Sequence, residues 1–107
     1  MAAKYRVEIT RTAEGDVEEI WTHIGADSIE HATKFIFQLE KKIDTLERMP
    51  HRCPLIPENK LLGTNYRHLI LGDYRVIFRI KASTVVVLRI LQGNRLLDSS
   101  FFDEAGV

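Results

Sequence analysis

Features that would indicate a membrane protein, a disulfide scaffold or a metal site are missing from this 107-residue sequence. No apolar run reaches the roughly 18 residues that a membrane-spanning helix needs. The N-terminus passes directly into an alternating strand pattern and carries no apolar signal segment. The single cysteine, Cys53, has no second cysteine to bond and no Cys or His pair at zinc-ligand spacing. We therefore expect a cytoplasmic protein without a metal, another cofactor or a membrane partner.

Side chains that could serve as a nucleophile or a base are scarce as well. Cys53 lies between Arg52 and Pro54 with no evident base beside it, which favours a passive thiol. The sequence has no glycine-rich loop that could hold a phosphate group. The histidines show no pairing with Cys or Asp at the spacing of metal ligands; they are His23, His31, His51 and His68.

Proline is confined to residues 50–57, and the chain before that stretch has the periodicity of regular structure. Apolar and polar residues alternate over residues 5–10, the pattern of a half-buried strand. The next apolar residues recur at helical spacing, with Thr12 as the expected N-cap and Gly25 as the expected stop. Together these signals predict a strand followed by an amphipathic helix.

A second helix is predicted directly after the first. Asp27 and Glu30 have the spacing of a capping box, and apolar residues then recur every three or four positions to about residue 48. Pro50 prevents continuation of this helix. Because few residues join the two helices, they should form an antiparallel hairpin. Phe35 and Phe37 widen its apolar surface, either as a thicker core or as a patch for a partner.

The stretch over residues 50–65 is predicted to be an irregular loop, and the chain from residue 66 onward is predicted to be all β. Gly72 and Asp73 form a plausible two-residue hairpin turn, and residues 81–83 are interpreted as a three-residue turn. One strand, a helical hairpin and a three-stranded antiparallel meander predict an α+β fold with the helices packed on one face of the sheet. We expect residues 1–107 to form a single domain.

Charge is unevenly distributed although its sum is zero. Residues 1–59 carry 8 basic and 11 acidic side chains, whereas residues 60–95 carry 7 basic ones and only one acidic one, Asp73. The last twelve residues add three acidic side chains and no basic one. The basic block coincides with the predicted meander, and this asymmetry points to an anionic partner.

The predicted turns also give a strand register. With residues 72–73 as the turn, Arg67 faces Phe78, and a three-residue turn at 81–83 sets Arg75 opposite Arg89 on an open face of the sheet. Opposed like charges are unfavourable, so these arginines should attract carboxylates from another chain or phosphates. The alternative is that each arginine is solvated or pairs locally. The candidate anion-binding residues are Arg67, Arg75, Arg79, Arg89 and Arg95.

The order strand–helix–helix–meander resembles the RelE/ParE superfamily of toxins in type II toxin–antitoxin systems. The residues that carry this resemblance are 16–21 in the first helix, 66–69 at the start of the meander, and 72–80 and 87–95 within it. The resemblance implies a toxin that a cognate antitoxin neutralises in a hetero-oligomer, and the five candidate anion-binding arginines would then bind the antitoxin. RelE-like members cleave mRNA on the ribosome, and ParE-like members inhibit DNA gyrase without a reaction of their own.

In a RelE-like nuclease, the resemblance would give functional basic roles to Arg67, Arg75 and Arg95. Three other positions depart from that pattern, because Leu69, Gln92 and Phe101 replace a lysine, a histidine and a tyrosine of that subgroup. None of the three side chains present here can transfer a proton. We therefore favour a gyrase-directed toxin of the ParE-like subgroup, as in plasmid stabilisation, over an enzyme.

The alternatives are a ribosome-dependent mRNA endoribonuclease and a non-toxic relative that only binds the antitoxin. Phe101 and Phe102 are candidates for a tail that contacts a partner, with packing into the core as the competing role.

Overall fold

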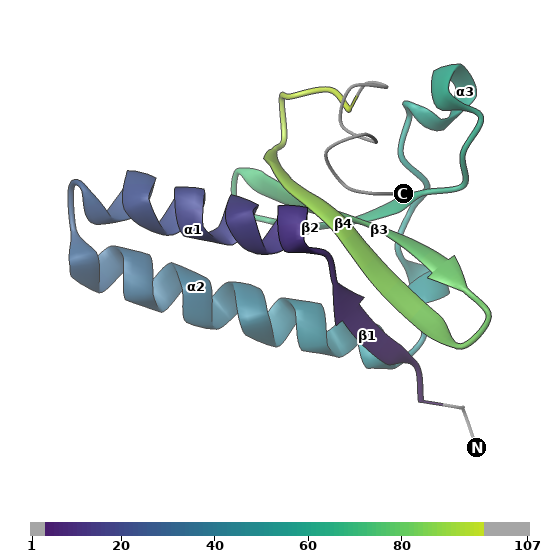
Figure 1. Cartoon of the computed structure of the whole chain (residues 1–107), viewed down its shortest axis with the longest axis horizontal. Coiled ribbons are helices and arrows are strands. Elements are labelled where there is room, and N and C mark those ends of the chain that lie inside the picture. The colour runs from purple at the N-terminus through teal and green to yellow at the C-terminus, as the bar shows by residue number, and fades with distance from the viewer. Residues whose placement is uncertain (1–3, 98–107) are drawn as a thin grey trace.

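A computed structural model describes residues 4–97 of the chain. A four-stranded sheet in the order β1-β4-β3-β2 is packed on one face by two long helices (Figure 1). β1 runs parallel to β4, and the other neighbours are antiparallel. The predicted α+β architecture is confirmed. Its elements are β1 (Arg6–Ile9), α1 (Arg11–Gly25), α2 (Ile29–Asp44), η1 (Thr45–Glu47), η2 (Pro50–Arg52), α3 (Asn59–Leu62), β2 (Arg67–Leu71), β3 (Tyr74–Lys81) and β4 (Thr84–Gln92).

Both long helices start at a different cap from the predicted one. Thr10, not Thr12, caps α1, since its hydroxyl accepts a hydrogen bond from the backbone of Ala13. Ser28, not Asp27, caps α2 in the same way. An N-cap residue needs an extended backbone, which Ser28 has, whereas the N–H of Asp27 is used to close the last turn of α1. The end of α1 at Gly25 agrees with the prediction.

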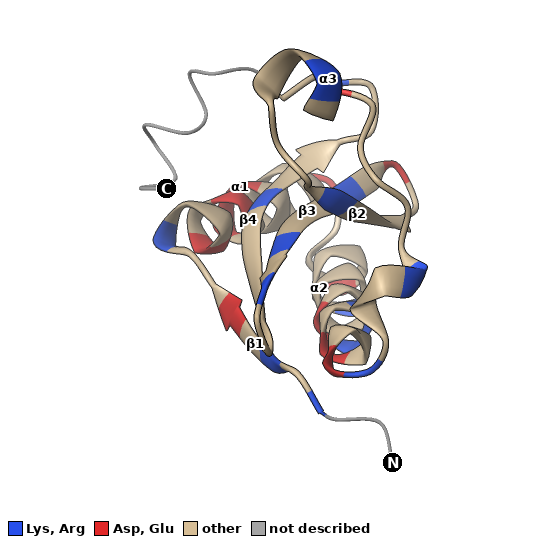
Figure 2. Cartoon of the chain, turned by 90° about the vertical axis from the view of Figure 1, so that its right-hand side faces the viewer, with Lys and Arg blue, Asp and Glu red and all other residues tan. Residues whose placement is uncertain are grey.

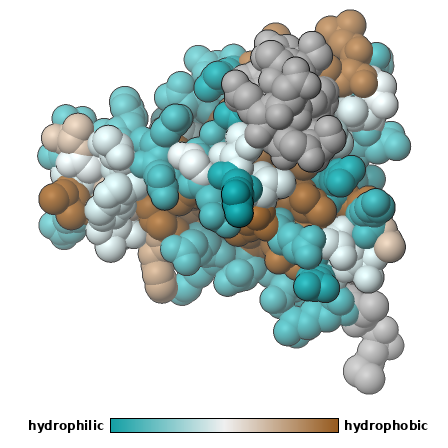
Figure 3. Space-filling model, viewed as in Figure 1, coloured by the Kyte–Doolittle hydropathy of each residue, from teal (hydrophilic) through white to brown (hydrophobic). Residues whose placement is uncertain are grey.

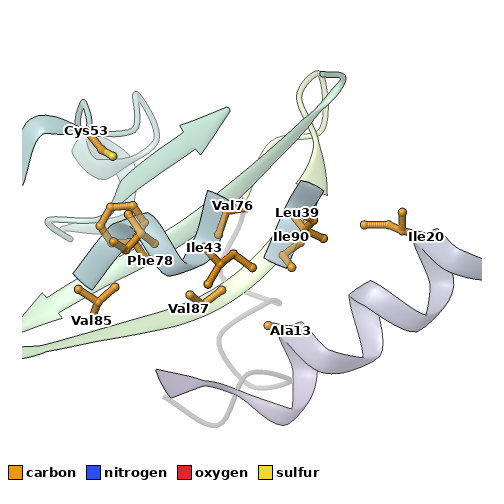
Figure 4. Packing of buried hydrophobic residues seen from close by; sticks show 11 residues of the cluster. Ala13, Ile20, Leu39, Ile43, Cys53, Val76, Phe78, Val85, Val87 and Ile90 are labelled. Atoms are coloured by element: carbon orange, nitrogen blue, oxygen red, sulfur yellow. The ribbon is translucent and has the colours of Figure 1, made fainter. Parts of the chain in front are cut away.

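The main hydrophobic core fills the space between the two helices and the first face of the sheet, as Figure 4 shows. Phe78 and Val76 of β3 and Leu39 of α2 are fully buried in it. Of the two phenylalanines in α2, Phe35 packs against this core, but Phe37 is 60% exposed. The remaining buried members are Ala13, Ile20, Ile43, Leu46, Cys53, Val85, Val87 and Ile90. None of the helices within residues 4–97 is long and apolar enough to span a bilayer.

The second face of the sheet carries a smaller core, so the expectation of an open face is wrong for this region. Ile77 of β3 and Leu88 of β4 are buried there, together with Ile56, Tyr66, Leu91 and Leu97. The stretch over residues 50–65 returns to the sheet, where the backbone N–H of Ile56 donates to the carbonyl of Tyr66. This stretch is not wholly irregular, because it contains η2 and α3.

Asn59 fixes the turn that brings α3 back to the sheet. Its side-chain amide donates to the carbonyl of Tyr66, and its side-chain oxygen accepts from the N–H of the same residue. Leu62 of α3 packs against the second core, but Leu61 is 94% exposed. Figure 3 shows a hydrophobic protrusion where Figure 1 places α3.

The register of the meander is right at its first turn and wrong at its second. Arg67 faces Phe78 around the turn at Gly72, whose φ of 56° suits a glycine. The second turn has two residues, because Ala82 takes a positive φ of 53° and Lys81 pairs with Thr84. A bulge in β4 shifts the pairing once more, between Ile77 and Phe78 of β3. As a result Arg75 lies opposite Leu91, and Arg89 lies opposite Ile77.

Candidate functional site

Arg75 lies on the second face, where a carboxylate of its own chain neutralises it. The side chain is 3% exposed, and both of its terminal nitrogens bond to Glu58, with Nη1 at 3.1 Å from Oε1. Glu58 Oε2 also accepts from the backbone N–H of Leu97 at 2.9 Å, and Arg75 Nη2 donates to the carbonyl of Arg95 at 2.8 Å. One arginine and one glutamate thus join three parts of the chain: β3, the start of α3 and the segment after β4.

The pKa of Glu58 reflects this arrangement. Burial acts to raise the pKa, but the hydrogen bonds from Arg75 and from the backbone of Leu97, with the charge of Arg75, lower it from 4.5 to about 2. His68 lies at the same site, with Nδ1 3.4 Å from Arg75 Nη1. Burial lowers the pKa of His68, and the charge of Arg75 lowers it further. Glu58 is therefore ionised and His68 neutral at pH 7.

Arg89 has a second internal carboxylate partner, on the other side of β4. Its Nε donates to Asp16 Oδ2 at 2.8 Å and its Nη2 to Oδ1 at 2.9 Å, and the same carboxylate accepts from the N–H of Ile90. Both side chains are buried. β1 ends at Ile9, and Thr10 then bonds to the backbone of β4, which sets the start of α1 beside the bulge. This placement brings Asp16 to Arg89.

Arg67 is held by backbone oxygens. Its Nη1 donates to the carbonyl of Cys53 at 2.6 Å and to that of His51 at 3.2 Å. Cys53 itself is buried, and its sulfur lies 3.7 Å from Nη1 of Arg52. The guanidinium of Arg67 thus fastens the η2 region to the edge strand β2.

The last two of the predicted arginines differ from the others. Arg79 is partly buried on the second face and lies close enough to Tyr66 to affect that group electrostatically. Its Nε, like that of Arg75, has no hydrogen-bond partner within residues 4–97. Burial raises the pKa of Tyr66, and the charge of Arg79 partly offsets the effect. Arg95 is exposed just beyond β4, next to a cavity of about 240 Å³ that α1 and the end of β4 also line.

The structure therefore does not bring the five arginines together on one open surface. The predicted opposition of Arg75 and Arg89 is wrong, because the shorter turn and the bulge move Arg89 by two positions. The stated alternative of local pairing holds for both residues, so neither requires an external anion. That the five arginines bind an antitoxin stays a prediction.

Sequence reasoning missed the two carboxylates that pair with these arginines. Asp16 gives one signal, since it lies on the apolar stripe of α1 between Ala13 and Ile20, where an acidic residue is out of place. Glu58 gives none, because it lies in a stretch without periodicity.

Two of the three positions that depart from the nuclease pattern, Leu69 and Gln92, lie within the described residues. Leu69 packs against the main core, and Gln92 is exposed at the end of β4. Phe101 and Phe102 lie outside the described residues. Within residues 4–97, no three His, Cys, Asp or Glu side chains form a group that could hold a metal ion.

Two solved structures share this architecture. One, the chromosomal ParDE toxin–antitoxin system of P. aeruginosa, aligns with a TM-score of 0.69 at 21% identity, over 85% of this chain and 98% of that one. The other, the RelBE2 toxin–antitoxin complex of Mycobacterium tuberculosis, aligns with a TM-score of 0.52 at 29% identity, over 83% of this chain and 98% of that one.

The family model described as the ParE toxin of type II toxin–antitoxin system, parDE, matches residues 7–97. The chain belongs to this family of toxins. The comparison with curated proteins gave no match.

Proposed function

We propose that this protein is a toxin that a cognate antitoxin neutralises in a hetero-oligomer, and that the free toxin inhibits DNA gyrase by binding to it. The observation that carries the proposal is the family match over residues 7–97. The internal neutralisation of Arg75 supports the choice of a binding mechanism over a catalytic one.

A nuclease would need free cations at the positions that the resemblance assigns to it. Arg75 would have to leave Glu58, and breaking a buried ion pair costs about 3–5 kcal/mol because a charge is left uncompensated. Arg67 already donates to two backbone carbonyls, and of the three arginines only Arg95 is exposed. Leu69 and Gln92 supply no general acid or base. Binding without chemistry agrees better with these contacts.

The antitoxin part of the proposal draws on the two neighbours, whose titles describe a ParDE toxin–antitoxin system and a RelBE2 toxin–antitoxin complex. Their toxins share the fold of this chain. The uneven charge of the chain adds to this argument, because Arg79 and Lys81 of β3 form no ion pair within residues 4–97, while acidic positions gather on α1 (Figure 2). An acidic partner segment would meet complementary charge on the sheet.

The test is a paired assay with the purified protein. One arm measures supercoiling of relaxed plasmid by DNA gyrase, and the other measures cleavage of translated mRNA by primer extension. We expect loss of supercoiling in the first arm and intact mRNA in the second. Unchanged supercoiling together with codon-positioned cuts would overturn the proposal in favour of a RelE-like endoribonuclease. If the protein changed neither supercoiling nor the mRNA, it would be a non-toxic relative that only binds the antitoxin.

A further inference from the structure

The cavity between α1, the start of β3 and the end of β4 has no part in the proposed function. Its volume is about 240 Å³. Asp16 bonds to Arg89 and to the backbone of Ile90, which holds this part of α1 alongside β4 (Figure 1). Ile20, Ile90 and Tyr74 line the cavity and also belong to the main core or pack against it. The cavity, which we call the α1–β4 cavity, therefore lies on the helix-covered face of the sheet.

The lining of the α1–β4 cavity combines buried apolar side chains with polar ones that have no partner in the chain. Ile20 and Ile90 are buried and supply the apolar part. Four polar or charged side chains also line the cavity: Glu19, His23, Tyr74 and Gln92. None of these four side chains forms a hydrogen bond or an ion pair within residues 4–97. An apolar wall with a few convergent polar groups is the usual composition of a small-molecule site.

The hydrogen-bonding capacity of these polar side chains restricts the ligand. The carboxylate of Glu19 only accepts, whereas the amide of Gln92 and the hydroxyl of Tyr74 can both donate and accept. A complementary ligand must therefore present donors and acceptors together along one edge. Because Ile20 and Ile90 form the apolar wall, the remaining surface of the ligand should be flat and apolar. A heteroaromatic ring with polar groups at its edge meets both requirements.

The charges around the α1–β4 cavity favour an uncharged ligand. Asp16 lines the cavity, but Arg89 neutralises its carboxylate through two hydrogen bonds. The negative charge of Glu19 is opposed by the positive charge of Arg95, which also lines the cavity. A cation or an anion would therefore be repelled by one of these two groups. Glu18 is exposed on the same helix and adds negative charge nearby, which disfavours the phosphate backbone of a nucleic acid (Figure 2).

We propose that the α1–β4 cavity binds the base of a free purine nucleoside with an exocyclic amino group, such as adenosine. The amino group donates to Glu19, and the flat ring packs on Ile20 and Ile90. Gln92 supplies the amide that can bond to the amino group and the neighbouring ring nitrogen of adenine at once. The volume of about 240 Å³ is below the roughly 300–1,000 Å³ of sites for drug-sized ligands, which limits the bound part to one ring system.

The inference can be tested by titrating adenosine into the full chain and following its amide resonances by NMR. The side-chain amide of Gln92 and the backbone amides of Ile20 and Ile90 report directly on the cavity. We expect saturable shifts of these resonances with a dissociation constant below about 1 mM, as a ligand of this size can reach. Uridine has a smaller base without the amino group, so it should bind at least about fivefold more weakly.

Two conservative variants locate the site. Glu19→Gln keeps the shape of the side chain but removes the charged acceptor, and should weaken adenosine binding by about tenfold. Tyr74→Phe keeps the ring contact with Phe35 but removes the hydroxyl, and should weaken binding by about fivefold. Glu18→Gln, an exposed neighbour that does not line the α1–β4 cavity, is the matched control and should leave binding unchanged. The thermal unfolding of each variant shows that it is folded.

Three outcomes would overturn the inference. One is the absence of saturable shifts up to about 10 mM adenosine, and another is equal affinity of the parent chain and Glu19→Gln for adenosine. The third is tighter binding of butylamine or of a short single-stranded oligonucleotide than of adenosine, which would identify a cation site or a nucleic-acid surface instead. None of these outcomes depends on gyrase or on an antitoxin, so they separate a failure of this inference from a failure of the proposed function.

Discussion

The two ends of the second face of the sheet use the same residue type for different purposes. At one end, Arg75 is buried and its two terminal nitrogens pair with Glu58, whose carboxylate also accepts a hydrogen bond from the backbone of Leu97. At the other end, Arg79 lies on the same strand and points to the same face, but it forms no ion pair with any carboxylate within residues 4–97. The difference lies in what the stretch over residues 50–65 covers, since it brings Glu58 over one end only.

This contrast shows that a basic strand is not by itself a binding surface. An arginine paired inside the chain stabilises the fold and is unavailable to a ligand, because leaving its partner costs several kcal/mol, about 3–5 in comparable buried pairs. An arginine without an internal partner keeps its capacity to bind. Arg89 belongs to the first kind, through Asp16, although it lies on a different strand from Arg75.

The largest effect is expected from removing a buried carboxylate. Asp16→Ala would leave the charge of Arg89 and the N–H of Ile90 without their partner, and should lower the free energy of unfolding by about 3–5 kcal/mol. Urea denaturation measures this change. Glu14→Ala, at an exposed position of the same helix, is the control and should change stability by less than about 0.5 kcal/mol. If Asp16→Ala lowered the free energy of unfolding as little as the control, the conclusion that Asp16 stabilises the fold by neutralising Arg89 would be contradicted.

A smaller, pH-dependent effect is expected at Glu58. Because its pKa is lowered to about 2 in the folded chain, its contribution to stability is present above the ordinary value of 4.5 and is lost as pH falls through about 2. The stability difference between the parent chain and Glu58→Gln should be about 3 kcal/mol at neutral pH and should shrink over this window.

Denaturation curves collected from neutral pH down to about pH 2 would measure this difference. A difference that does not change with pH would show that Glu58 is not held ionised by Arg75.

Much of the architecture follows from the sequence because its signals are local. The alternation of β1, the apolar stripes of α1 and α2 and the turn at Gly72 each depend on residues a few positions apart. The helix caps were misplaced by one or two residues, since several residues that could cap an N-terminus stand close together before each helix.

The site was harder to predict because its contacts are distant in sequence. Asp16 and Arg89 are 73 residues apart in the sequence. Their contact depends on a bulge in β4 that the residue pattern of this strand does not predict. Ala82 adopts a backbone conformation that favours glycine, so the turn over residues 81–83 was assigned one residue too many. The shorter turn and the bulge each shift the pairing of β3 with β4 by one position, so Arg75 and Arg89 no longer lie opposite each other.

The most direct test of the contrast between the two ends compares Arg75→Gln with Arg79→Gln in the same urea denaturation experiment. The first variant leaves Glu58 as a buried, unpaired carboxylate, whereas the second removes a charge that has no ion-pair partner within residues 4–97. We predict a loss of about 3 kcal/mol or more for Arg75→Gln and a change within about 0.5 kcal/mol for Arg79→Gln. Equal losses, or a larger loss for Arg79→Gln, would contradict the conclusion that Arg75 stabilises the fold through Glu58 and that Arg79 does not.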